Sequence, residues 1–212
     1  MDTSLLDPAR LDTTHLFAIA AALGWASGLR LYAVVFLTGL AGFLGWVPLP
    51  EGLKVLQHPL MLGASGLMLA VEFFADKVPG LDSLWDVLHT LVRIPAGAAL
   101  AAGAFGGDQA AWSMAAALMG GTLAATSHVA KATTRAAANT SPEPFSNVAL
   151  SLAGDALVPA ALWMSWQHPA GFFVALAVAL VAMVGVTLLL LKFLKALFRS
   201  LRDRLGGHRA TA

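Results

Sequence analysis

The sequence predicts an all-α membrane protein of about six transmembrane helices, built as a 3+3 inverted repeat with broken helices. Three observations support this prediction. The 212 residues are 58% hydrophobic and 12% charged, with a mean hydropathy of +0.75, whereas soluble domains carry roughly 25% charged residues. Apolar runs long enough to cross the hydrocarbon layer recur along the chain. Short motifs of the first half also recur in the second half.

Six apolar stretches define the expected spans, and the segments between them are too short for a soluble domain. They lie at about residues 15–45, 59–76, 89–106, 110–130, 147–165 and 169–191. We therefore expect one transmembrane domain over residues 15–191, between an N-terminal segment of residues 1–14 and a basic tail of residues 192–212. Three Asp residues against Arg10 precede the first span, which is unlike a cleavable signal peptide, so we expect this span in the mature protein.

The distribution of Lys and Arg predicts the orientation of these spans. An even number of spans puts both termini on one side of the membrane. With both termini in the cytoplasm, eleven Lys and Arg side chains face inside and only Lys54 faces outside. The positive-inside rule therefore predicts cytoplasmic termini, and the basic tail suits the anionic cytoplasmic leaflet.

The first span is longer than one crossing needs and is interrupted by the motif "GWASGLRLY", which contains Gly24, Gly28 and Arg30. We expect a broken or kinked helix here, with its freed backbone groups bonded to protein or water because lipid offers no hydrogen-bond partner. Gly24 and Gly28 fit a close helix-packing seam equally well. A seam alone leaves the charge of Arg30 unexplained.

An internal repeat relates the two halves of the chain, residues 15–106 and 110–191. The motif "ADKVPGLDSLW" of the first half resembles "GDALVPAALW" of the second and aligns Asp76 with Asp155. Arg30 has a counterpart in Arg135. Because three spans are an odd number, the second unit would cross the membrane in the opposite sense, which is a recurrent plan of transporters.

Glu72 and Asp76 lie one helical turn apart at the end of an apolar stretch. Two carboxylates on one helix face repel each other, more so in a low dielectric. A proton, a bound cation or an arginine such as Arg30 or Arg93 is needed to compensate. Alternatively, Asp76 is solvated at the membrane interface and Glu72 extends towards it. An ionisable group inside a membrane is by default a functional-site candidate.

A second group of charged residues recurs at helical spacing. Asp82, Asp86, His89 and Arg93 fall on one stripe. This stripe is either a proton or ion path, with His89 the group that most readily changes charge near neutral pH, or the wet face of an interfacial helix.

The segment of residues 131–147 is unusually polar, and its two prolines forbid a continuous helix. Asn139, Ser141 and Glu143 offer oxygens and amides in quick succession. They line a binding site if the segment is re-entrant. If it is a plain cytoplasmic loop, Arg135 and Glu143 form only a local ion pair.

Asp155 is the least ambiguous buried charge, since it lies about eight residues into an apolar run. A lone carboxylate there costs roughly 2.5–3.5 kcal/mol on insertion scales. Arg30, Arg135 or Lys131 could offset this cost, and a static pair is the structural alternative.

Several chemistries are excluded or disfavoured. The chain has no cysteine, which excludes disulfides and thiol chemistry. It shows no nucleophile triad, phosphate loop or zinc-binding helix motif. We therefore expect no cofactor and no nucleic-acid partner, and we do not favour an enzyme. Asp82, Asp86 and His89 are the only set that would serve one at the membrane surface.

The run "EFFADKVPGLDSLWD" at residues 72–86, the element "SGLR" at residues 27–30 and the polar stretch leading to Asp155 resemble a bacterial membrane-protein family, domain of unknown function 4126. The resemblance covers roughly residues 17–190. It implies a multi-pass protein of the bacterial inner membrane and supplies no activity.

Together these features predict a small transporter or channel for an ion or small solute, linked to cations or protons. Glu72, Asp76 and Asp155 would bind the ion or proton, with Arg30 and Arg135 as their charge partners. The expected partners are the lipid bilayer, the transported species and a second copy of the chain, since 22.0 kDa is small for a transporter. The alternative is a non-transporting membrane protein, either structural or a lipid-handling enzyme, whose buried charges pair statically.

Overall fold

The computed structural model describes residues 11–78, 80–106, 109–140 and 145–207, and this part of the chain is all-α. It holds six α-helices and one 3₁₀-helix: α1 (Thr13–Phe43), η3 (Glu51–Gln57), α2 (Pro59–Ala75), α3 (Leu81–Gly103), α4 (Ala110–Ala138), α5 (Phe145–Gln167) and α6 (Pro169–Gly207). Each of the six expected stretches coincides with one α-helix. The predicted helical class and helix order are therefore confirmed.

Three of the described helices, α1, α5 and α6, are long and apolar enough to cross a membrane by themselves. The η3 and α2 helices are bent by 70° and give a fourth candidate if they count as one broken span. Helix α3 falls short because it carries Asp82, Asp86 and Arg93 on its buried face. These long apolar helices indicate a membrane location, with three or four candidate spans.

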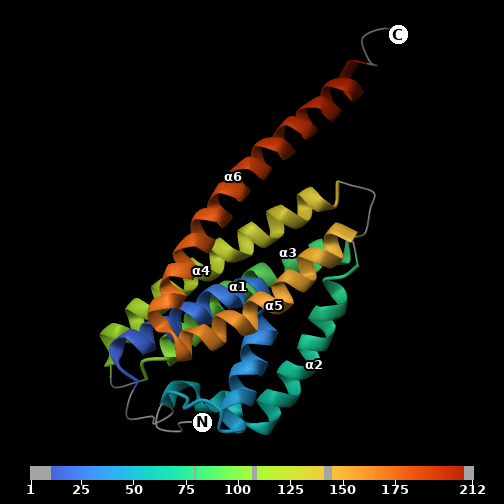
Figure 1. The fold of residues 1–212 in the computed structure, drawn as a ribbon. Helices are drawn as coiled ribbons and strands as arrows, with labels where there is room; N and C mark the ends of the chain where they lie inside the picture. The colour runs from blue at the N-terminus through green and yellow to red at the C-terminus, as the bar shows by residue number, and fades with distance from the viewer. Residues whose placement is uncertain (1–10, 79, 107–108, 141–144, 208–212) are drawn as a thin grey trace.

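Helix α1 is the central element and is broken at Arg30. In its most apolar stretch, 83% of the residues are buried by the surrounding helices. The backbone of Arg30 leaves helical geometry at φ −148° and ψ 86°. Figure 1 shows the two arms of α1 diverging, the first among α3, α4 and α5 and the second alongside α2. The break expected in this motif is therefore present.

Carbonyl groups near the break bond to side chains of α4. Ser127 Oγ donates to the carbonyl of Trp25 at 2.6 Å, and Lys131 Nζ donates to the carbonyl of Leu29 at 3.1 Å. Protein groups thus satisfy the backbone, as a lipid environment requires.

The close packing seam is also present, so the two interpretations of the glycine motif hold together. A Cβ added to Gly24 would overlap the Cα of Gly120 on α4, and one added to Gly28 would overlap Ser127 Oγ. Only glycine allows α1 and α4 to approach this closely. The seam brings the break at Arg30, called the elbow of α1 below, directly against α4.

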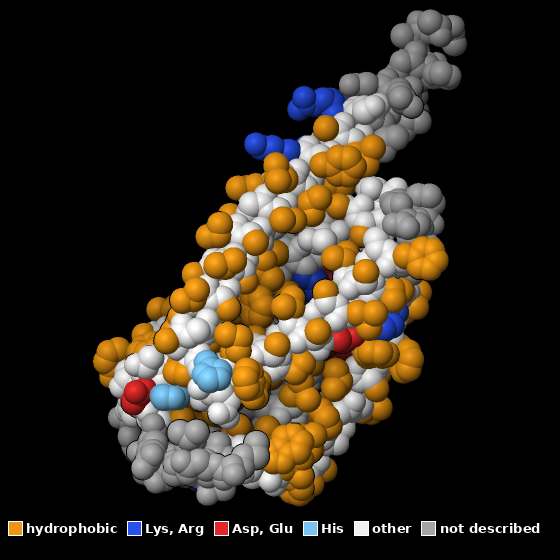
Figure 2. Space-filling view, in the orientation of Figure 1, with side chains coloured by type: hydrophobic (Ala, Val, Ile, Leu, Met, Phe, Trp, Pro, Cys, Tyr) orange, Lys and Arg blue, Asp and Glu red, His pale blue; other side chains and the backbone are white. Residues whose placement is uncertain are grey.

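Helix α6 is the most exposed of the three helices that could each cross a membrane by themselves. Only 6% of its most apolar stretch is buried, and Figure 1 shows its C-terminal part projecting beyond the other helices. Figure 2 shows hydrophobic side chains along this helix, with Lys and Arg side chains towards its outer part. Such a large exposed apolar surface is unusual for a protein in water and suits contact with lipid.

Candidate functional site

Ten charged side chains meet around the elbow of α1 and are called the charge cluster below. They come from five helices and from the turn after α2. Among the described residues the cluster holds five carboxylates and five cations: Glu72, Asp76, Asp82, Asp86, Asp155, Arg30, Lys77, Arg93, Lys131 and Arg135. Only Lys77 and Asp155 have side chains more than 20% exposed, at 21% and 24%. The cluster is therefore a buried, charge-balanced network.

Arg93 compensates the charge of Glu72. Arg93 Nη2 donates to Glu72 Oε1 at 2.6 Å, and Arg93 Nη1 donates to Asp86 Oδ1 at 2.7 Å. All three side chains are buried. Glu72 therefore does not extend to a membrane interface. An arginine, one of the three expected compensations, is therefore present.

Asp76 is the most heavily paired carboxylate. Its Oδ2 lies 3.2 Å from Arg30 Nη2, 3.0 Å from Lys131 Nζ and 3.4 Å from Arg135 Nη2. Arg135 Nη1 also donates to the backbone carbonyl of Asp76 at 2.6 Å. Because the Asp76 side chain is fully buried, the solvated alternative is wrong for this residue. A buried carboxylate persists only with such partners.

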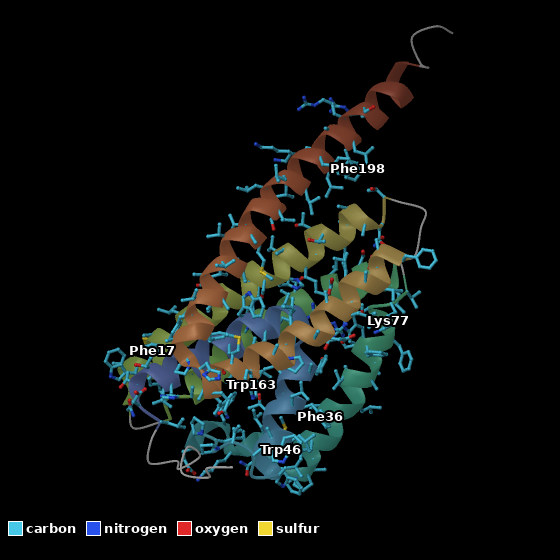
Figure 3. All side chains as sticks on the ribbon, in the orientation of Figure 1. Phe17, Phe36, Trp46, Lys77, Trp163 and Phe198 are labelled. Atoms are coloured by element: carbon cyan, nitrogen blue, oxygen red, sulfur yellow. The ribbon has the colours of Figure 1, made fainter. Side chains whose placement is uncertain are left out.

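Arg30 joins Asp76 to Asp155. Arg30 Nε lies 3.0 Å from Asp155 Oδ1, and Arg30 Nη2 donates to Ser151 Oγ at 2.8 Å. Lys77 Nζ lies 3.4 Å from Asp155 Oδ2. Figure 3 shows Lys77 where α2 ends beside α5. Asp76 and Asp155, which the predicted repeat would align, thus share one arginine.

Arg135 links the cluster to the polar end of α4. Arg135 Nη1 donates to Asp82 Oδ2 at 3.1 Å, and Asn139 Nδ2 donates to Asp82 Oδ1 at 3.2 Å. Asn139 therefore belongs to the edge of the site. Ser141 and Glu143 lie outside the described residues, so the re-entrant and plain-loop interpretations of their segment both remain predictions.

The stripe on α3 divides into two environments. Asp82, Asp86 and Arg93 are buried in the charge cluster, which contradicts a wet helix face. His89 faces elsewhere: its Nε2 lies 3.1 Å from the Tyr32 hydroxyl oxygen, and its Nδ1 lies 2.9 Å from the Trp85 carbonyl oxygen. The three residues considered for surface enzyme chemistry therefore do not converge.

Two members of the site, Lys77 and Ser151, were not singled out by sequence, and Lys131 was named only as a possible partner of Asp155. Lys131 bridges Asp76 and Asp86, at 3.0 and 3.1 Å. A signal was available, since Lys131 lies one turn before Arg135 and Ser151 lies one turn before Asp155. Residues one turn from a buried charge on the same helix face are natural members of its site.

A cavity of about 250 Å³ opens against the charge cluster between α1, α4, α5 and α6. Charged residues on one side of the cavity are Arg30, Asp76, Lys131 and Arg135, whereas α5 and α6 supply mainly apolar residues. In Figure 2 a hollow opens between α5 and α6, with hydrophobic side chains along its edges and a Lys or Arg side chain at its base. The cluster is therefore reachable through this cavity.

The described residues contain no group of three His, Asp or Glu side chains placed to hold a metal ion. Every carboxylate of the charge cluster faces at least one cationic side chain instead.

A model of the family described as Domain of unknown function (DUF4126) matches residues 17–188. No curated protein and no solved structure matches the chain. The matched region covers all ten members of the charge cluster.

Proposed function

Since the chain belongs to the DUF4126 family, whose name assigns no activity, we propose its function from the site itself: a small membrane transporter or channel that moves an ion or small solute through the charge cluster. The observation that carries this proposal is a buried, charge-balanced network that meets a cavity. Charges inside a membrane domain are costly and mark substrate or ion pathways more often than packing. Apolar residues of similar volume would hold the helices together at least as well.

The geometry favours proton linkage at Asp76. Arg30, Lys131 and Arg135 all contact this carboxylate and also line the cavity. An anion that enters the cavity competes with Asp76 for these cations. If Asp76 takes up a proton as the anion binds, the site keeps its charge balance, which a low dielectric strongly favours. Anion and proton would then move together without net charge transfer. The cation-linked alternative requires a carboxylate to leave its cationic partners.

The proposal includes six crossings of the bacterial inner membrane, cytoplasmic termini, and an inverted relation between residues 15–106 and 110–191. Support for the repeat comes from Arg30, which contacts both aligned carboxylates, Asp76 and Asp155. We also propose a homodimer, because a chain of 22.0 kDa is small for a transporter.

Reconstitution into liposomes tests this function. Proton and ion fluxes would be followed for the native protein and for Glu72→Gln, Asp76→Asn and Asp155→Asn. We expect at least a tenfold loss of flux in variants that keep their helical content and a single elution peak. Glu51→Gln is a matched control, because the Glu51 side chain is exposed and pairs only with Lys54 among the described residues. If the native protein carries none of the tested ions, the proposal fails.

A static role for the charges is the second candidate. It is favoured by the contact that each of Glu72, Asp76 and Asp155 makes with an arginine. In that case the native protein would show no flux, and the three substitutions would lower the unfolding temperature and change nothing else.

A further inference from the structure

We infer that the cavity beside the charge cluster binds a single-chain anionic amphiphile, with a carboxylate or phosphate headgroup at Arg30, Lys131 and Arg135 and a hydrocarbon chain between α5 and α6. This inference names a substrate class for the proposed transport site and rests on that function only for the transport step. Binding itself stands on the geometry of the cavity.

The polar side of the cavity carries excess positive charge. Three cations and one carboxylate line it: Arg30, Lys131, Arg135 and Asp76. Other carboxylates of the charge cluster lie behind these cations and do not line the cavity. The surface that meets a ligand therefore favours an anion.

Two buried guanidinium nitrogens lack a hydrogen-bond acceptor among the described residues. Arg30 Nη1 and Arg135 Nε have no hydrogen-bond partner within the described part of the chain, although both residues are at least 98% buried. Buried donors are almost always bonded in folded proteins. Guanidinium groups match carboxylate and phosphate oxygens in both charge and geometry. Arg30 and Arg135 both line the cavity, so an anionic headgroup there would lie beside these guanidinium groups.

The opposite walls are apolar and favour a hydrocarbon chain. Leu150, Ala153 and Leu157 recur on one face of α5, and Met183 and Val186 lie one turn apart on α6. A small water-soluble anion would leave these walls in contact with water. A hydrocarbon chain covers them and keeps this apolar surface away from water.

The size and the opening favour one chain whose end lies outside. At about 250 Å³, the cavity is smaller than the roughly 300–1,000 Å³ of typical small-molecule sites. It therefore holds a headgroup and the first part of a single chain. The hollow in Figure 2 opens between α5 and α6, whose outer surfaces are hydrophobic, so the rest of the chain would continue into the lipid.

Binding is tested with the purified protein in a neutral detergent. The probes are dodecyl phosphate and dodecanoate, compared with inorganic phosphate, acetate and dodecanol. We expect both amphiphilic anions to raise the unfolding temperature and to bind by calorimetry. The same concentrations of the free anions and of the neutral alcohol should have no effect. Equal binding of inorganic phosphate would overturn the assignment to an amphiphile.

Variants in the apolar wall separate binding from folding. Ala153→Trp fills the cavity from its apolar wall and removes no charged group, and we expect it to weaken dodecyl phosphate binding at least tenfold. Ala156→Trp on the same helix is the control, because Ala156 is exposed and does not line the cavity. Unchanged binding in a folded Ala153→Trp variant would overturn the inference.

Two further measurements are needed. One distinguishes a single-chain ligand from a membrane phospholipid, and the other distinguishes ligand binding from transport. In the first, the protein is placed in nanodiscs that contain phosphatidylglycerol. If this phospholipid displaces dodecyl phosphate, the ligand is a membrane phospholipid and the assignment to a single-chain amphiphile is wrong. Ligand binding without any flux would leave the binding site standing and remove the transport function. Flux of a small ion without amphiphile binding would support the transport function and remove the amphiphile site.

Discussion

Arg30 contacts acidic residues from both halves of the chain. It contacts Asp76, Asp155 and Ser151, and its backbone forms the break in α1. A rigid guanidinium can serve partners in several directions, whereas an ammonium group offers one compact charge. Arg30 thus ties the elbow of α1 to α2 and α5 through one side chain.

Arg30→Lys keeps the charge and removes this bridging geometry. We expect a loss of about 1–3 kcal/mol in the free energy of unfolding, because buried acceptors lose their donors. Chemical denaturation of the purified protein in detergent measures it. The control is Lys54→Arg, because Lys54 forms an exposed ion pair with Glu51. We expect it to change the free energy of unfolding by less than about 1 kcal/mol. Equal stability of Arg30→Lys and the native protein would refute the bridging role.

The two aligned carboxylates should differ in their contribution to stability. Asp76 is fully buried among three cations, whereas the Asp155 side chain is 24% exposed between two. Breaking a fully buried charge pair costs about 3–5 kcal/mol. We therefore expect Asp76→Asn to destabilise by about that amount and Asp155→Asn by clearly less. Thermal unfolding followed by circular dichroism gives the order, and a reversed order would contradict the observed burial.

Much of the site was predictable from single residues. Few cations lie in the apolar stretches, so Arg30 and Arg93 were natural partners for Glu72, Asp76 and Asp155. Lys131 was expected only as a possible partner of Asp155, and its contacts with Asp76 and Asp86 were not expected, because a lysine near a polar segment resembles an ordinary loop residue. The cavity was not predictable, since its apolar walls have the same composition as surfaces that face lipid.

At the scale of elements, the seam between α1 and α4 sets the geometry of the site. It holds Arg30 on α1 close to Lys131 and Arg135 on α4, and all three contact Asp76. A change in the spacing between these two helices would therefore disturb several ion pairs at once.

Gly24→Ala should disrupt this seam. The added methyl group would overlap the backbone of Gly120, and overpacking of this kind costs about 1–3 kcal/mol. Gly63→Ala on α2 is the same chemical change at a position with open space, where a gain of up to about 1 kcal/mol is expected from helix propensity. The unfolding temperatures of the two variants test this prediction. If both variants unfold at the same temperature, close packing of α1 against α4 does not contribute to stability.

The helix ends show where sequence patterns lose information. Helix α3 begins at Leu81, well before the expected start of its apolar stretch at residue 89, because Asp82 and Asp86 are buried by pairing. Helix α4 continues to Ala138 for the same reason, with Arg135 held by Asp76 and Asp82. Hydropathy assigns charged residues to water and therefore ends such helices too early.

At the scale of the whole molecule, the orientation in the membrane is the main prediction. The chain contains no cysteine, so single-cysteine variants need no prior engineering. We expect a membrane-impermeant maleimide to label Lys54→Cys in intact spheroplasts and Arg202→Cys only after the membrane is opened. Mass spectrometry of the purified variants reads the labelling. The opposite pattern would invert the orientation, and equal labelling of both variants in intact spheroplasts would refute six crossings.

The length of α6 has a practical consequence. Its 39 residues correspond to about 58 Å at 1.5 Å per residue, whereas a bilayer with its headgroups is roughly 40–45 Å thick. If α6 crosses the bilayer upright, its last turns stand clear of the headgroups. A rigid partner protein joined there by a continuous helix would add a visible mass at a fixed position. Such a fusion would bring a chain of 22.0 kDa within reach of single-particle electron microscopy.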